Sequence, residues 1–245
     1  MRNIRLTLEY DGTRYHGWQR QKNALTIQEV LETALARLCG DAVKLHGSGR
    51  TDAGVHALGQ IANFRTLSHI PLKAFHAGLN SLLPPDIAVL AAAEVPPEFH
   101  ARKSARAKTY EYRILNRANR SPLHHHYGWW IAARLDLDAM AAAAALLPGE
   151  HDFSAFRASG SGNRNPVRQI SAARWQTHPG GWLRFTATAN GFLRGMVRSL
   201  VGTMVEVGKG KLPEGHLADL LESKNRSLAG PTAPAQGLYL VEVVY

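Results

Sequence analysis

One stretch of this sequence sets the arrangement of the rest: Gly47-Ser48-Gly49-Arg50-Thr51-Asp52-Ala53-Gly54-Val55-His56. Its glycines let the chain turn tightly and let another molecule approach the backbone, so we expect the Asp52 carboxylate to be presented rather than packed. Residues 55–65 follow as a predicted strand in which Ile61 and Phe64 suit the core. The stretch therefore predicts a loop that leads into a strand, and it is a candidate site.

The residues before this stretch predict a strand, a loop and a helix. Ile4, Leu6 and Leu8 alternate with polar residues, which is the period of a strand with one buried face. Thr26-Ile27-Gln28-Glu29 fits a capping box, in which the threonine and glutamate side chains satisfy free backbone amides. An apolar stripe at helical spacing then runs to Gly40, where we expect the helix to end.

Strands and helices also alternate along the rest of the chain. A helix is predicted from Pro71 to the Pro84-Pro85 pair, followed by a buried strand at 87–95. Later elements are strands at 107–115, 167–177, 182–189 and 237–245, and helices at 137–147, 192–207 and about 213–221. Because strands outnumber helices and hairpins recur, we expect an α+β fold, a mainly antiparallel sheet with helices packed on it.

Two prolines mark the predicted lobe boundary. Pro96-Pro97 interrupts both helix and strand, so we divide the chain into an N-terminal lobe, 1–103, and a C-terminal lobe, 104–245. The first lobe carries the Asp52 loop. Between Arg157 and Pro166 the sequence predicts a flexible basic loop.

The composition of the 245 residues indicates a globular protein with an anionic partner. Apolar residues make up 45% of the chain, and 29 Lys and Arg against 19 Asp and Glu give a net charge of +10. This charge favours nucleic acid, although composition does not separate RNA from DNA or from an anionic membrane. The start lacks a signal peptide and no apolar run reaches the roughly 20 residues of a membrane span, so we expect a cytoplasmic protein without membrane contact.

Local chemistry narrows what Asp52 could do. Arg50 favours its ionised form, which suits nucleophilic or electrostatic work. No second carboxylate stands nearby for a paired-acid hydrolase, and the glycine pattern is not that of a phosphate-binding Walker loop. His124-His125-His126 invites a metal site, but adjacent histidines on an extended chain point to opposite sides. A structural interpretation stays open, in which Asp52 caps a turn and pairs with Arg50.

The block Gly49-Arg50-Thr51-Asp52-Ala53-Gly54-Val55-His56, preceded by Tyr10-Asp11-Gly12 and Gly17-Trp18-Gln19-Arg20-Gln21, resembles the TruA family of tRNA pseudouridine synthases. The resemblance covers nearly the whole chain. It continues in order through Phe99-His100-Ala101-Arg102, Tyr110-Glu111-Tyr112, Asp152-Phe153-Ser154-Ala155-Phe156, Met196-Val197-Arg198 and Gly237-Leu238-Tyr239-Leu240.

This resemblance implies an isomerase that converts uridine to pseudouridine at positions 38, 39 and 40 in the anticodon arm of tRNA. It implies base flipping, a homodimer, and no cofactor or metal. It also implies two similar α/β lobes that meet at a central RNA-binding cleft, with residues 104–245 completing the active site and the dimer interface. Asp52 would be the catalytic aspartate, acting on C6 of uracil, on the sugar, or as a base towards the sugar.

The resemblance extends to four substrate-binding residues. Arg50 resembles the arginine that holds the flipped nucleotide, and Tyr110 the tyrosine that stacks on the target uracil. Arg198 resembles the basic residue that orients the aspartate, and Leu238 the apolar residue that closes the pocket. Packing alone is the alternative for Tyr110 and Leu238. The rival functions are a non-catalytic tRNA-binding protein and a hydrolase of nucleic acid.

Overall fold

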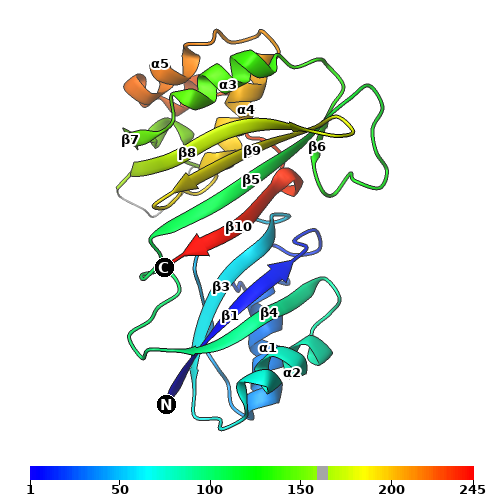
Figure 1. Ribbon diagram of the computed structural model, residues 1–245, viewed down its shortest axis with the longest axis vertical. Helices are drawn as coiled ribbons and strands as arrows, with labels where there is room; N and C mark the ends of the chain where they lie inside the picture. The colour runs from blue at the N-terminus through cyan, green and yellow to red at the C-terminus, as the bar shows by residue number, and fades with distance from the viewer. Residues whose placement is uncertain (159–164) are drawn as a thin grey trace. The chain divides into compact units, whose positions relative to one another are not determined.

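The chain folds into two compact units, seen in a computed structural model that describes residues 1–158 and 165–245 (Figure 1). The first unit comprises Met1–Arg106 with Tyr239–Tyr245, and the second comprises Ala107–Leu238. The last strand thus belongs with the first unit, whereas the sequence predicts one lobe for residues 104–245. The predicted basic loop falls largely on residues 159–164, outside the described residues.

The first unit is built on one sheet in the order β4-β1-β3-β10. Its strands are β1 (Arg2–Tyr10), β2 (His46–Gly47), β3 (His56–Thr66), β4 (Ile87–Val95) and β10 (Leu238–Val244). β1 pairs antiparallel with β3 and β4, β2 pairs antiparallel with β3, and β10 runs parallel to β3. Ile4, Leu6 and Leu8 are fully buried, as their alternation predicted.

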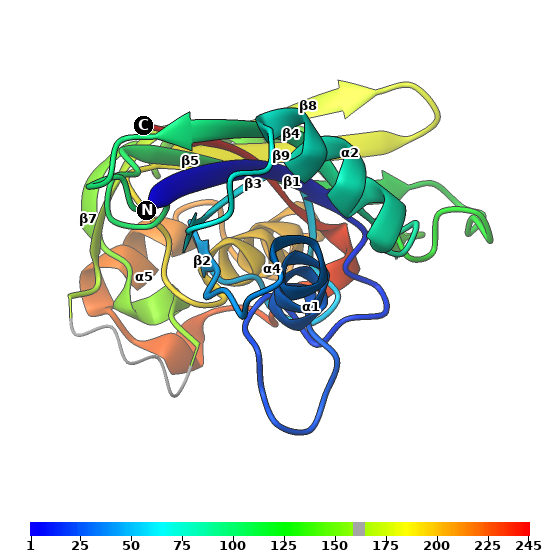
Figure 2. The same ribbon diagram turned by 90° about the horizontal axis from the view of Figure 1, so that it is seen from below.

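Two helices complete this unit, α1 (Ile27–Cys39) and α2 (Leu72–Leu82). α1 lies beneath the strands in Figure 2, and Phe75 of α2 packs edge-on against Phe64 of β3, with ring centroids 5.5 Å apart. The prediction that β4 is buried is wrong in its second half. Leu90 is 45% exposed, because β4 is the edge strand of this sheet.

The start and end of α1 follow the chemistry that its sequence predicted. Thr26 Oγ1 accepts the Glu29 N–H at 3.4 Å, which is one half of the predicted capping box. The Glu29 carboxylate lies 3.6 Å from Arg20. Gly40 takes a left-handed conformation (φ 81°) and donates to Ala36 O, so it ends the helix as expected.

The second unit holds a sheet in the order β5-β9-β8-β7, antiparallel throughout, with β6 parallel to β5. Its elements are β5 (Ala107–Asn116), β6 (Trp129–Ile131), α3 (Leu137–Ala145), β7 (Gly149–Asp152), η1 (Ser154–Phe156), β8 (Val167–His178), β9 (Trp182–Ala189), α4 (Met196–Gly208), α5 (His216–Ser223), η2 (Arg226–Leu228) and η3 (Ala235–Gly237). β8 and β9 form the predicted hairpin. α4 begins at Met196 rather than at Phe192, because Gly195 is left-handed (φ 73°) and cannot continue a helix.

Each unit therefore carries a mainly antiparallel sheet with helices packed on it, and the predicted α+β fold is confirmed. In the part of the chain that the structure describes, no helix is long and apolar enough to cross a membrane.

Candidate active site

The Asp52 loop connects β2 to β3 in the first unit, as the sequence predicted. Its backbone turns back on itself, because the Val55 N–H donates to Asp52 O at 3.2 Å and Gly54 adopts φ 79°. Thr51 is buried, Asp52 is half-buried, and Arg50 is exposed. The loop thus anchors one residue in the core and presents its two neighbours.

A second loop, residues 11–18, braces the Asp52 loop from the side. The Trp18 N–H donates to Thr51 O at 3.1 Å, and the Gly54 N–H donates to Tyr15 O at 3.3 Å. A Cβ at Gly17 would collide with Thr51 O, so only glycine allows this approach. The 11–18 loop and the Asp52 loop are far apart in the sequence, and their hydrogen bonds hold the Asp52 loop in place.

Beneath the loop lies a buried network of polar side chains. The hydroxyls of Tyr10 and Thr51 are 2.9 Å apart. Ser48 Oγ donates to Gln60 Oε1 at 2.6 Å, and Gln60 Nε2 donates to Gly49 O at 3.0 Å. Burial raises the pKa of Tyr10 to about 12, so the phenol keeps its proton at neutral pH. The network fixes the backbone on both sides of Arg50.

Sequence reasoning missed Gln60, although one signal was available. Gln60 interrupts the face of β3 that carries Ala62 and Phe64, and those residues lie opposite Leu6 and Ile4 of β1. A polar side chain in an apolar face of a strand needs a buried partner. This requirement would have placed Gln60 next to polar groups of the neighbouring loop.

His56, which ends the motif, has a structural partner. The Gly12 N–H donates to His56 Nδ1 at 3.1 Å, and the imidazole stacks on Tyr239 with centroids 4.7 Å apart. The same Nδ1 lies 3.1 Å from the Asp11 carboxylate, so this nitrogen contacts two residues of the 11–18 loop. His56 therefore fastens the 11–18 loop to β3.

The other three predicted site residues lie in the second unit. Tyr110 on β5 is only 7% exposed, and its ring meets Phe192 edge-on at 5.1 Å. Leu238, also 7% exposed, follows η3 at the start of β10. Arg198 on α4 donates from Nε to Ala233 O at 2.7 Å, so this arginine has the partner that its place in an apolar stripe requires.

The chain around Leu238 is fastened to α4 and β5. Arg198 O accepts the Ala233 N–H at 3.0 Å, and the Tyr112 hydroxyl donates to Pro234 O at 2.7 Å. Burial raises the pKa of Tyr112 far above its usual value, so it stays a neutral donor. The second unit thus brings Arg198 and the segment before Leu238 together, while the first unit brings Arg50 and Asp52 together.

The histidines at 124–126 bond locally. His124 Nδ1 lies 2.9 Å from Ser121 Oγ, and His125 Nδ1 lies 2.6 Å from Pro122 O. Across residues 1–158 and 165–245, no three His, Cys, Asp or Glu side chains are grouped as metal ligands.

Comparison with known proteins gives a consistent result. Residues 7–102 and 143–245 match the family model described as tRNA pseudouridine synthase. The tRNA pseudouridine synthase A of Thermoanaerobacter sp. (strain X514) is 48% identical over 245 residues, which cover all of both chains. That of Myxococcus xanthus is 50% identical over 245 residues, which cover all of this chain and 92% of the relative.

Similarity to solved structures is lower. The alignment with one chain of a Cbf5-Nop10-Gar1 complex covers 97% of this chain and 48% of that one, with a TM-score of 0.40 and 9% identity. The ranges matched by the family model contain Arg50, Asp52, Arg198 and Leu238, and Tyr110 lies between them.

Proposed function

This chain belongs to the family of tRNA pseudouridine synthases, isomerases that convert uridine in tRNA to pseudouridine, and we propose that it acts at positions 38, 39 and 40 of the anticodon arm with Asp52 as its catalytic residue. The observation that carries this proposal is the way the Asp52 loop is held in place. Its backbone is fixed by the 11–18 loop and by a buried polar network, while the Asp52 side chain remains half-exposed. Family membership does not support the alternative of a non-catalytic tRNA-binding protein.

The reaction moves the glycosidic bond of uridine from N1 to C5. The base leaves its stack, detaches, turns and reattaches; C5 then loses its proton and N1 gains one, so no oxidant or reductant is needed. Extruding a base costs a few kcal/mol, which protein groups offset. The Asp52 carboxylate either bonds to C6 of uracil, bonds to the sugar, or takes a proton from the sugar. Each route requires a carboxylate held in a fixed position.

Four further side chains act together with Asp52 in this proposal. Arg50 is exposed next to Asp52 and occupies the place that the flipped base leaves. Tyr110 stacks on the uracil, a contact worth about 1–3 kcal/mol, and its packing against Phe192 supports a fixed ring. Arg198 orients the catalytic carboxylate, and Leu238 closes the apolar side of the pocket. We further propose a cytoplasmic homodimer whose interface lies within residues 104–245.

Release of tritium from uracil C5 tests the role of Asp52. With tRNA that carries tritium at C5, we expect the wild-type protein to release the label and Asp52→Asn to release none. The amide keeps the size of the side chain but removes the charge, so tRNA binding is retained. Undiminished release by Asp52→Asn would remove Asp52 from the mechanism. No release by the wild type from any tRNA would contradict the isomerase activity itself.

A further inference from the structure

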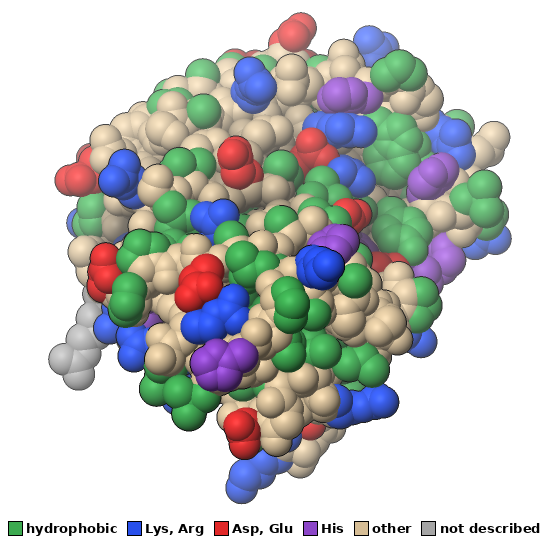
Figure 3. Space-filling model, turned by 60° about the horizontal axis from the view of Figure 1, so that its bottom comes forward, with side chains coloured by type: hydrophobic (Ala, Val, Ile, Leu, Met, Phe, Trp, Pro, Cys, Tyr) green, Lys and Arg blue, Asp and Glu red, His purple; other side chains and the backbone are tan. Residues whose placement is uncertain are grey.

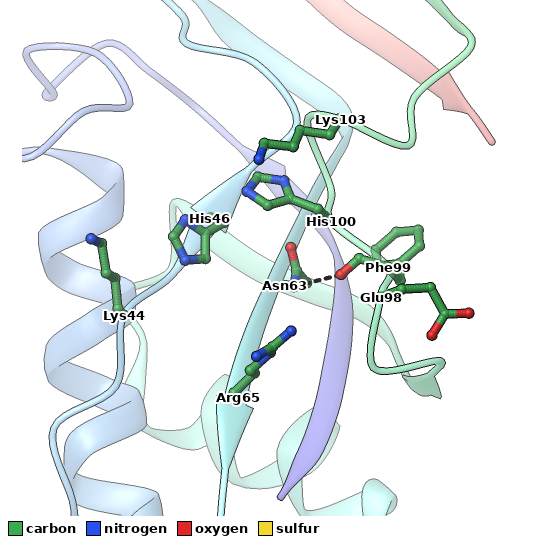
Figure 4. Close-up of a pocket in the computed structure, with 8 residues that line it drawn as sticks. All are labelled: Lys44, His46, Asn63, Arg65, Glu98, Phe99, His100 and Lys103. Carbon is green, nitrogen blue, oxygen red and sulfur yellow. Dashed lines mark hydrogen bonds between the residues drawn. The ribbon is translucent and has the colours of Figure 1, made fainter.

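Apart from the Asp52 loop, the first unit contains a hollow of about 510 Å³. Five basic side chains line it: Lys44, His46, Arg65, His100 and Lys103. In Figure 4, the imidazole rings of His46 and His100 face each other, with centroids 5.0 Å apart. The volume falls within the range of small-ligand sites, about 300–1,000 Å³. Nothing in the proposed reaction uses this hollow.

A buried pair of asparagines holds one wall of the hollow in place. Asn63 Nδ2 donates to Asn3 Oδ1 at 2.9 Å, across β3 and β1. Asn3 Nδ2 donates to Pro96 O and Phe99 O, both at 2.9 Å, and Asn63 Oδ1 accepts the Ala101 N–H at 2.8 Å. The segment that carries His100 and Lys103 is therefore fastened to the sheet at several points, so the hollow is a built feature of the fold.

The charges around the hollow favour an anion. Lys44, Arg65 and Lys103 outnumber the one lining carboxylate, Glu98, which Figure 4 shows directed away from the two imidazole rings. His100 Nδ1 accepts the Arg102 N–H at 3.1 Å, so neutral His100 carries its proton on Nε2, as a donor.

The pKa of His46 also reflects the basic residues around the hollow. Burial lowers the pKa of His46, and the nearby charges of His100, Lys44 and Arg65 lower it further, while Glu32 opposes them. Burial disfavours a charge of either sign, so only the contribution of the neighbouring basic residues bears on an anion, and it points the same way as the lining of the hollow.

We infer that this hollow binds a backbone phosphate of the RNA substrate, an assignment that rests on the proposed function. Its lining offers N–H donors and cations, which is the chemistry that grips phosphates rather than reads bases. Asn63, a side chain that could read a base edge, is already bonded to Asn3 and Ala101. His46 precedes Asp52 by six residues, which span at most about 22 Å. One RNA arm is long enough to reach both the hollow and the Asp52 loop, so we assign the phosphate to the arm that carries the target nucleotide.

Two lysines of the hollow suit the test, because Lys44 and Lys103 are exposed and their loss should not disturb folding. Lys103→Gln and Lys44→Gln are compared with Lys73→Gln, the same change at an exposed position of α2 outside the hollow. The tRNA dissociation constant is measured from about 50 to 200 mM salt, with tritium release at varied tRNA concentration. We expect each hollow variant to weaken binding several-fold, to raise KM, and to reduce the salt slope by about 1. Lys73→Gln should match the wild type.

The outcomes separate this assignment from the proposed function. If the wild type releases tritium but Lys103→Gln and Lys44→Gln bind tRNA as Lys73→Gln does, the hollow plays no part in RNA binding. If the wild type releases none, the proposed function fails, whatever the salt slopes show. Inorganic phosphate, titrated while the His46 imidazole is followed by NMR, detects a site for free anions. Saturation of that signal together with unchanged tRNA binding in both variants would also overturn the assignment.

Discussion

Single side chains beneath the Asp52 loop decide where the Asp52 carboxylate stands. The Tyr10 hydroxyl contacts Thr51 Oγ1 at 2.9 Å, one residue before Asp52, and both groups are buried. Trp18 packs beside these two residues. Its ring centroid lies 6.2 Å from that of Tyr10, and the ring fills the space where a Cβ at Gly47 would stand. A buried hydroxyl that loses its partner costs about 1–3 kcal/mol, so the Thr51 hydroxyl depends on Tyr10.

Replacing Tyr10 by phenylalanine tests this dependence. Tyr10→Phe keeps the ring but removes the hydroxyl, so we expect the free energy of unfolding in urea to fall by about 1–2 kcal/mol. Because the loop loses a fixed point next to Asp52, kcat for tritium release should fall more than KM changes. Tyr245→Phe, which loses a 2.7 Å hydrogen bond to Ala101 O in the same unit, is the control. It should destabilise the protein comparably without lowering kcat, and equal kcat in both variants would contradict a positioning role for Tyr10.

Elements act in pairs in the first unit, where the 11–18 loop and the Asp52 loop support each other. A comparison of two glycines distinguishes the effect of this loop contact on stability and activity from the effect of a left-handed backbone conformation. Gly17 and Gly40 are both left-handed, with φ 84° and 81°. A Cβ at Gly17 would collide with Thr51 O, whereas a Cβ at Gly40 would meet nothing within 4 Å.

Alanine at these two positions should therefore act differently. Both variants adopt an unfavourable backbone conformation, which costs about 1–2 kcal/mol. Only Gly17→Ala also displaces the Thr51 carbonyl, so its unfolding free energy should fall further and its tritium release should drop at saturating tRNA. Thermal unfolding and single-turnover release measure the two effects. If Gly40→Ala loses as much activity as Gly17→Ala, the contact between the loops is not what sustains the Asp52 position.

The sequence predicted elements well where the signal is local. Thr26 and Gly40 mark the ends of α1 because capping depends on neighbours a few residues away. Periodicity also located β1 and β5, whose buried residues alternate with exposed or half-buried ones over much of each strand. The start of α4 was placed too early, because an apolar stripe does not reveal that Gly195 adopts positive φ.

Support of the site could not be predicted in the same way, because it depends on contacts between distant segments. Asp52 and Arg50 stand out in the sequence, and their shared loop was predicted. The hydrogen-bond partners of Gln60 and the close approach of Gly17 to Thr51 O are fixed only when β1, β3 and their loops are in register. The five basic residues of the hollow are spread over residues 44–103, and only His100 falls in a quoted motif, so the sequence does not show that they line one hollow.

At the scale of the whole molecule, the positive charge is not gathered into one block of sequence. On the face drawn in Figure 3, Lys and Arg side chains stand as separate groups with Asp and Glu side chains between them. The net charge of +10 therefore acts as a general attraction for RNA. The specific position of the RNA then depends on structured sites such as the hollow and the Asp52 loop.

Salt should separate this general attraction from the chemical step. Each phosphate that the protein neutralises releases counterions, so the logarithm of tRNA affinity falls linearly with the logarithm of salt, by about 0.7–0.9 per phosphate contact. A protein that makes several such contacts should lose affinity by about a thousandfold between 50 and 200 mM salt. Tritium release at saturating tRNA should change far less, because hydrogen bonds that salt screens little hold the backbone of the Asp52 loop. Circular dichroism over the same range confirms that the fold persists. An affinity that stays flat across this range would mean that the positive charge has no part in holding the tRNA.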